Sequence, residues 1–183
     1  MDHKLLPRSA LIDTGVFIRA LRERQDKETP DCVDFVEAML NQHCELIIAA
    51  PTLAEILRFK KGQQPPTMHG ITVGAFDDEA ARILGQKFPE DTLVEFRQKT
   101  GNPLHYYKYD ALIVACAMRW EVECIVAIDG DIFRLGKENK LRVERPEAFR
   151  AKQGRLALVH SPTATPAPDS TGAPNSSLKD SKS

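Results

Sequence analysis

The chain has 183 residues, with 25 Lys and Arg against 26 Asp and Glu, so its formal net charge is -1. This balance excludes a strong overall field that would attract nucleic acid or a membrane surface, and a polyanionic partner must therefore meet local basic groups. Hydrophobic residues make up 42% of the chain. That content suffices for one ordinary core, and the length favours one domain with an appendage over two domains.

The sequence has no stretch of the ~18 to 20 consecutive apolar residues that a membrane span requires, and its start, MDHKLLPRSALID, lacks the longer apolar core of a signal peptide. We therefore expect a cytoplasmic protein with no membrane association. The cysteines form no CxxC pair, and we expect them to be reduced, buried and to act as small hydrophobic side chains. They are Cys32, Cys44, Cys116 and Cys124.

The composition changes near the end of the chain. Residues 161–183 are rich in Ser, Thr, Pro, Ala and Gly, and Leu178 is their one large apolar side chain. Such a segment cannot bury enough surface to offset the ordering entropy of about 1 to 2 kcal/mol per residue. The sequence therefore predicts a folded domain over residues 1–150, a connecting segment over 151–160 and a disordered tail over 161–183.

Within the domain, short strand-like apolar blocks alternate with longer helical ones, which favours an α/β domain with a mostly parallel sheet. The predicted order is βααβαβααββ, and a mixed polar stretch between the helices 79–88 and 109–120 is left without an element. In chain order, the predicted elements are strand 9–13, helix 14–24, a helix from Asp31, strand 45–50, a helix from near Pro51, strand 71–76, helix 79–88 behind the capping pair Asp77 and Asp78, helix 109–120, strand 124–128 and strand 141–143.

Acidic residues stand at the edges of these apolar blocks, and each has an ordinary structural explanation. Asp13 ends the first strand and is a suitable helix cap. Glu55 completes a capping-box pattern with Thr52. Asp110 at the head of an apolar helix would offset the helix dipole, and the Asp129-Gly-Asp131 motif is a common signal for a tight hairpin turn.

Four acidic motifs at the ends of apolar strands or the starts of apolar helices are less easily explained as separate coincidences. In an open α/β sheet, ligands bind in the crevice at these positions. The motifs are LIDTGVFI, TLAEIL, YDALIVACA and AIDGDIF. In this order they resemble the PIN-domain nucleases, and most closely the VapC-type toxin ribonucleases. The resemblance covers about residues 9–150, and it departs from the family pattern at Gly15 and Ala127.

The resemblance implies a PIN-like (Rossmann-like) three-layer α/β/α sandwich with a mostly parallel central sheet. It also implies a metal-dependent endoribonuclease that hydrolyses RNA phosphodiester bonds, the toxin of a toxin–antitoxin pair held in check by a cognate antitoxin protein, and a homodimer. The catalytic residues implied are Asp13, Glu55, Asp110 and Asp129.

Converging carboxylates would need counterions, because two like charges ~4 Å apart repel by roughly 4 kcal/mol at an effective dielectric of about 20. Hard carboxylate oxygens without His or Cys select Mg²⁺ or Mn²⁺, as one ion or two. By resemblance, Asp13, Asp110 and Asp129 are the main ligands. Glu55 and Asp131 are assigned to a second ion or to orienting water.

Because the net charge is close to zero, RNA must be attracted by local bases. Basic side chains follow the first two acidic motifs closely, and the predicted RNA contacts are Arg19, Arg58, Lys60 and Lys108. The segment His105-Tyr-Tyr-Lys108 would also offer aromatic rings for stacking on an unpaired base. For charged helix ends, a solvated surface is the alternative interpretation.

Two rival functions stay open at this point. Gly15 and Ala127 suggest a non-catalytic PIN-like module that binds RNA or a protein without cutting. The Asp129-Gly-Asp131 motif also suggests the nucleophile pair of a haloacid-dehalogenase-like phosphatase, but in that fold most of the domain follows the motif, and here little does.

Overall fold

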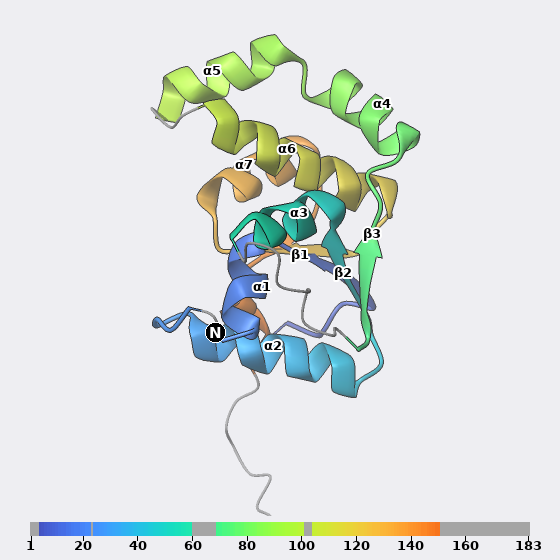
Figure 1. Ribbon diagram of the computed structural model, residues 1–183, viewed down its shortest axis with the longest axis vertical. Helices are drawn as coiled ribbons and strands as arrows, with labels where there is room; N and C mark the ends of the chain where they lie inside the picture. Colours follow the sequence, from blue (N-terminus) through green and yellow to red (C-terminus); the bar gives the residue numbers. More distant parts are fainter. Residues whose placement is uncertain (1–3, 23, 60–68, 101–103, 151–183) are drawn as a thin grey trace, which may run out of the picture. The chain divides into compact units, whose positions relative to one another are not determined.

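A computed structural model describes residues 4–22, 24–59, 69–100 and 104–150. The predicted connecting segment and tail, and Lys60, lie outside these residues. Five parallel strands form one sheet in the order β3-β2-β1-β4-β5. The strands are β1 (Ser9–Ile12), β2 (Glu45–Ala49), β3 (Ile71–Gly74), β4 (Cys124–Val126) and β5 (Val143–Glu144) (Figure 1).

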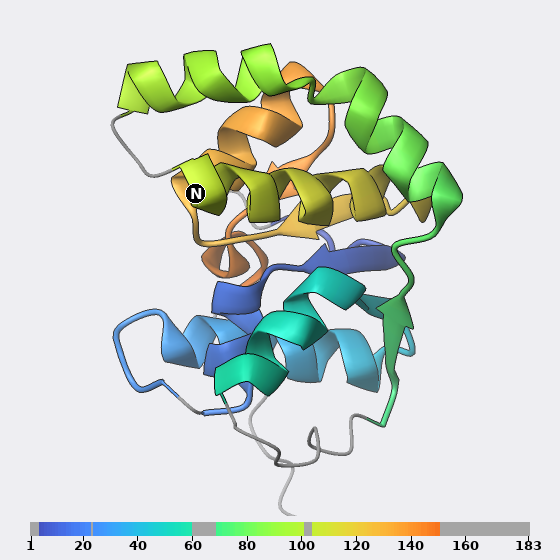
Figure 2. The ribbon, with the colours of Figure 1, turned by 45° about the horizontal axis from the view of Figure 1, so that its top comes forward.

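Helices connect the strands and end in a short 3₁₀ turn. They are α1 (Thr14–Ala20), α2 (Thr29–Asn41), α3 (Ala50–Phe59), α4 (Asp78–Lys87), α5 (Glu90–Thr100), α6 (Leu104–Arg119), α7 (Gly130–Glu138) and η1 (Pro146–Phe149). Figure 2 shows α4 to α7 on one side of the sheet and α1 and α2 on the other. The domain is therefore the predicted three-layer α/β/α sandwich.

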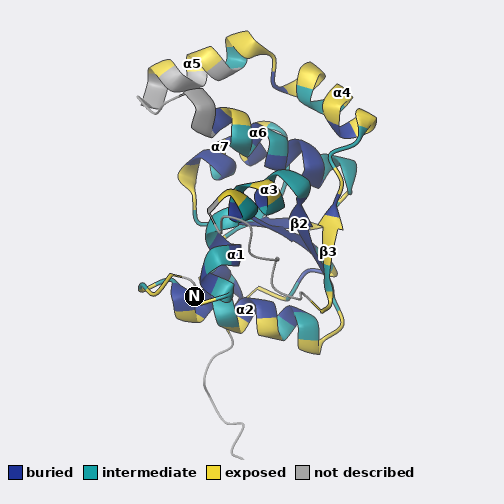
Figure 3. Cartoon of the chain, viewed as in Figure 1, coloured by how far each residue is buried: buried dark blue, intermediate teal, exposed yellow. Residues whose placement is uncertain are grey.

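Alternate side chains of the central strands supply two hydrophobic cores, as expected for a sheet buried on both faces. Leu11, Ile47 and Ile125 pack toward α6 and α7. Ile12 and Ile48 pack toward α1 and α2 on the opposite face. The central strands appear fully buried in Figure 3, whereas α4 presents a largely exposed surface.

The sequence prediction missed two helices and misplaced the start of a third. The mixed polar stretch contains α5, and the segment after β4 forms α7 instead of a hairpin. Because α7 crosses between β4 and β5, these strands are parallel. Helix α6 begins at Leu104, five positions before the predicted start.

Several smaller predictions can be compared with the structure directly. Asp77 caps α4 by accepting a hydrogen bond from the backbone N–H of Ala80 (3.0 Å), as predicted. The four cysteines are free, and all but Cys44 are buried. The capping box is wrong, because α3 begins at Ala50 and Thr52 lies inside the helix. No helix in the described part of the chain is long and apolar enough to cross a membrane.

Candidate metal centre

Asp13 stands at the carboxyl end of β1, where the chain turns into α1. The backbone N–H of Val16 donates to Asp13 Oδ1 (2.6 Å), so the predicted helix cap is present. The backbone N–H of Ile128 donates to Asp13 Oδ2 (3.2 Å). This buried carboxylate therefore ties the end of β1 to the loop that follows β4.

Asp129 and Asp131 stand at the carboxyl end of the adjacent strand, β4. Asp129 is the N-cap of α7, and its Oδ1 accepts a hydrogen bond from the backbone N–H of Asp131 (2.8 Å). Asp131 lies in the first turn of α7 and is buried, whereas Asp129 is exposed. The Asp-Gly-Asp motif thus starts a helix, and the hairpin interpretation is wrong because the cap satisfies the first turn of α7.

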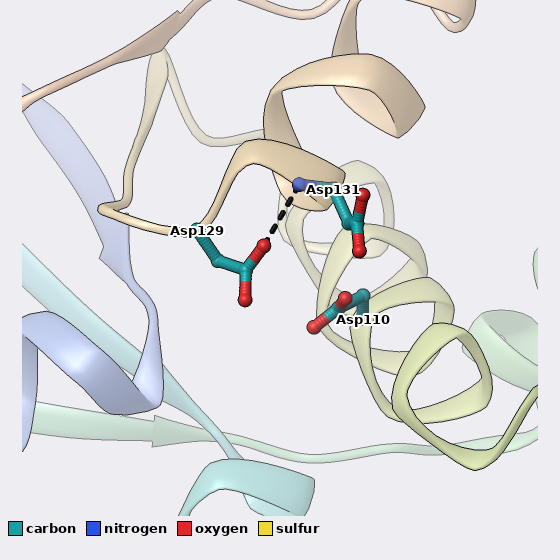
Figure 4. Close-up of side chains that lie close together, drawn as sticks. All are labelled: Asp110, Asp129 and Asp131. Atoms are coloured by element: carbon teal, nitrogen blue, oxygen red, sulfur yellow. Dashed lines mark hydrogen bonds between the residues drawn. The ribbon is translucent and has the colours of Figure 1, made fainter. Parts of the chain in front are cut away.

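Asp110 approaches these two residues from α6. It lies in the second turn of that helix and not at its head, so the predicted compensation of the helix dipole does not apply. Carboxylate oxygens of Asp110, Asp129 and Asp131 all lie within 4.8 Å of one another. Figure 4 shows the three side chains gathered from α6 and from the start of α7. We call these three residues the acidic cluster.

Two members of the acidic cluster, Asp110 and Asp129, line a cavity of about 330 Å³. Asp13 and Glu55 line the same cavity, but neither belongs to the acidic cluster. The sequence placed Asp131 at the margin of the site and Asp13 among the main ligands; in the structure Asp131 belongs to the acidic cluster, and Asp13 lines the cavity. All five predicted acids nevertheless lie around one place in the fold.

Burial and neighbouring charge raise the pKa of two of these acids. The pKa of Asp110 rises to about 8, first because of burial and then because of the charges on Asp129 and Asp131. The pKa of Asp13 rises to about 6, chiefly through burial, although hydrogen bonds from backbone N–H groups oppose the rise. The site is thus too negative to ionise fully without a compensating cation.

Of the predicted RNA contacts, Arg19 is occupied within the fold. Its guanidinium is 8% exposed, lies 2.7 Å from Asp26 Oδ2, and donates to the backbone carbonyl of Gly15 (3.0 Å). Arg19 therefore anchors the loop between α1 and α2 and also lines the cavity, and its role as an RNA contact stays a prediction. No local sequence pattern predicts this ion pair, because Asp26 lies in a loop seven positions after Arg19.

The other predicted bases are placed at the surface. Arg58 is exposed and donates to the hydroxyl of Tyr109 (3.0 Å), which lines the cavity. Lys108 is exposed and lies 3.6 Å from Glu90. Tyr107 is fully buried, so its ring belongs to the core and is not free to stack on a base.

Two further cavity residues were not among the predicted site residues. Tyr109 precedes Asp110 directly, and this adjacency is the only sequence signal for it. Arg24 lines the cavity with a side chain that is 64% exposed and an Nε 2.9 Å from Asp26 Oδ2. Arg24 thus adds a second, more exposed positive charge to the cavity, which Arg19 also lines.

Comparison with known proteins gives matches in structure but not in sequence. No protein-family model matches the chain, and no curated protein does. The structure of VapBC2 from Rickettsia felis bound to a DNA fragment from their promoter matches with a TM-score of 0.52 and 12% identity, over 74% of this chain and 97% of the matched chain. FitAB bound to IR36 DNA matches with a TM-score of 0.51 and 16% identity, over 80% and 99%.

These matches concern the fold. The chain has the PIN-like α/β/α architecture that its motifs predicted, similar to a chain of VapBC and FitAB complexes.

Proposed function

We propose that this protein is a metal-dependent endoribonuclease that hydrolyses phosphodiester bonds in RNA. The observation that carries the proposal is the acidic cluster, in which Asp110, Asp129 and Asp131 converge from two helices within 4.8 Å. A structural explanation covers only part of it, because capping accounts for Asp129 but for neither Asp131 nor Asp110. An uncompensated cluster of this kind would oppose folding.

The donor set fits Mg²⁺ or Mn²⁺. It consists of carboxylate oxygens without His or Cys, which suits hard divalent cations. When bound, such an ion would polarise the scissile phosphate, lower the pKa of an attacking water and offset charge on the leaving oxygen. The acidic cluster would hold one ion, and Asp13 and Glu55 would contribute to a second one or orient water.

The surrounding residues support the acidic cluster in different ways. Asp13 fixes the backbone at Ile128, next to Asp129, and so holds that ligand at the mouth of the cavity. Arg24 and Arg58 lie at or beside the cavity rim, where their guanidinium groups suit the phosphates on either side of the scissile bond. Lys60 and Lys108 stay predicted RNA contacts.

We also propose that the protein is the toxin of a toxin–antitoxin pair. The support is the fold, because the structures that it matches are complexes named VapBC2 and FitAB. An active nuclease in a cell needs restraint, and a partner that covers the acidic cluster would provide it. The product of the neighbouring reading frame should then form a complex with this chain and suppress cleavage.

The test is an RNA cleavage assay on the purified chain, freed of any inhibitor. We expect cleavage with Mg²⁺ or Mn²⁺, none with EDTA, and a loss of at least about 100-fold in Asp110→Asn and in Asp13→Asn. Asp34→Asn on the exposed surface of α2 is the matched control and should cleave like the wild type. Persistent cleavage in both site variants would reject the proposal, and RNA binding without any product would favour the non-catalytic module.

A further inference from the structure

A second cavity lies between α7 and β5. Its volume is about 570 Å³, and the apolar part of its lining comes from Phe133, Leu141 and Val143. We call it the α7–β5 groove. None of the function described above uses it.

Basic side chains dominate the charge of this groove. Arg134, Lys137, Lys140 and Arg142 line it, against one acid, Glu144. In a chain with a net charge of -1 this is a local concentration of positive charge. Arg142 is ion-paired with Glu144 (3.4 Å) and with another surface acid.

The two lysines, in contrast, are available to a ligand. Lys137 and Lys140 are exposed, and within the described ranges no carboxylate pairs with either of them. They therefore suit an anionic partner that comes from outside the chain.

Arg134 connects the groove to the acidic cluster. Its side chain lines the groove, and its Nη1 lies 3.4 Å from Oδ1 of Asp131. Lys137 follows three residues later, so it lies about one turn further along the same side of α7. At a rise of 1.5 Å per residue, Lys137 is roughly 9 Å along the helix axis from Asp131.

We infer that the α7–β5 groove binds single-stranded RNA on one side of the scissile bond, with Lys137 and Lys140 as contacts to its phosphates. The inference rests on the proposed function, because RNA cut at the acidic cluster would reach the groove past Arg134, which lines the groove and pairs with Asp131. The apolar lining suits sugar and base faces, as in other basic grooves that follow a single strand. An acidic peptide would pair with Lys137 and Lys140, but its binding would not explain why Arg134 connects the groove to the acidic cluster.

The experiment compares two double variants of the full chain. Lys137→Gln/Lys140→Gln alters the groove, and Arg82→Gln/Lys87→Gln removes the same charge from the exposed surface of α4. Binding of a labelled single-stranded RNA of about 12 nucleotides is measured by anisotropy in EDTA, over a range of salt concentrations. Circular dichroism melts verify that both variants fold.

We expect the groove variant to bind this RNA roughly tenfold more weakly at about 0.1 M salt, and its salt slope to fall by about 1.4, since each single-strand phosphate contact contributes ~0.7. The α4 variant should match the wild type. With Mg²⁺ present, cleavage of a dinucleotide should be equal in all three proteins, because its one linking phosphate is the scissile one and none is left for Lys137 or Lys140 to contact.

The outcomes separate this inference from the proposed function. Equal affinity and equal salt slope in the two double variants would overturn the groove assignment, even if the wild type cleaves RNA. Weaker RNA binding by the groove variant, with no cleavage by the wild type, would support the groove and reject the nuclease. A groove variant that loses binding of polyglutamate but not of RNA would also overturn the assignment, in favour of an acidic peptide.

Discussion

Asp110 lies where burial and neighbouring carboxylates both oppose its ionisation. Its pKa in the folded chain is about 8, against an ordinary value of 3.8. A carboxyl group whose pKa is raised on folding contributes stability that is fully present below the ordinary value and is lost as pH rises through the folded value. Asp13 acts in the same direction, with a folded pKa of about 6.

We therefore predict that the metal-free protein loses stability between pH 5 and pH 8. The free energy of unfolding should fall by more than about 1 kcal/mol, since one pKa unit corresponds to about 1.4 kcal/mol. Asp110→Asn should remove most of this slope and be more stable than the wild type at pH 8. Urea unfolding in EDTA at several pH values measures both effects.

Two comparisons make this result specific. Asp34→Asn on the surface of α2 should keep the wild-type slope. Asp26 loses its proton well below this range, because its ion pair with Arg19 lowers its pKa to about 2. A wild-type protein equally stable at pH 5 and pH 8 would contradict the description of Asp110 as an acid whose ionisation is opposed by partial burial and by neighbouring carboxylates.

Residue by residue, the sequence predicted which acids meet but not how each is arranged. Asp13 and Asp129 were predictable because each ends a parallel strand, and such ends meet at one edge of the sheet. The membership of Asp131 in the acidic cluster was not predictable, because it depends on the formation of α7, in whose first turn this residue lies. The burial of Arg19 depends on its ion pair with the loop residue Asp26, which no local sequence pattern predicts.

At the scale of elements, α7 and β5 pack so closely that a single methyl group would disturb them. A Cβ built on Gly136 would lie 2.2 Å from Cγ2 of Val143. Gly136 is buried, so an added methyl group would have to displace Val143 or move α7 away from β5. The glycine thus sets the distance between the helix that starts with the acidic cluster and the edge strand beside it.

We predict that Gly136→Ala lowers the free energy of unfolding by about 1 to 3 kcal/mol through overpacking. The matched change Gly85→Ala in α4 should instead raise it by roughly 0.5 to 1 kcal/mol, because a Cβ there meets nothing within 4 Å and alanine is the better helix former. Thermal or urea unfolding of the two variants gives the comparison. Stabilisation by both substitutions would show that α7 and β5 are not in close contact.

The element predictions failed where local signals pointed away from the structure formed. The Asp-Gly pair after β4 is a strong hairpin signal, so a hairpin was predicted there. The structure instead has the helix α7, which Asp129 caps. Helix α5 contains many charged residues and was left as a polar stretch. Strands β1, β2 and β4 were predicted because they are continuous apolar runs, which burial on both faces requires.

At the scale of the whole molecule, charge is balanced overall but separated locally. Acids gather at the carboxyl ends of β1 and β4, and bases gather further along α7, in the α7–β5 groove. A net charge of -1 conceals this separation, which only the fold produces. The composition could exclude a general attraction to RNA, but it could not locate the surface that would bind it.

Binding of a cation to the acidic cluster should stabilise the whole domain, because the unfolded chain does not hold these carboxylates together. We predict that Mg²⁺ or Mn²⁺ at about 100 times its dissociation constant raises the free energy of unfolding by about 2.7 kcal/mol. Thermal unfolding with metal or with EDTA measures the gain. Asp129→Asn, an exposed member of the cluster, should fold normally and lose most of this gain.

The same binding should release protons near pH 7, because the pKa of Asp110 is about 8 without metal and its carboxyl must ionise to become a ligand. Titration calorimetry in two buffers of different ionisation enthalpy detects this release, which should shrink toward pH 9. Heats that are the same in both buffers, with stabilisation retained in Asp129→Asn, would mean that the cation binds elsewhere on the domain.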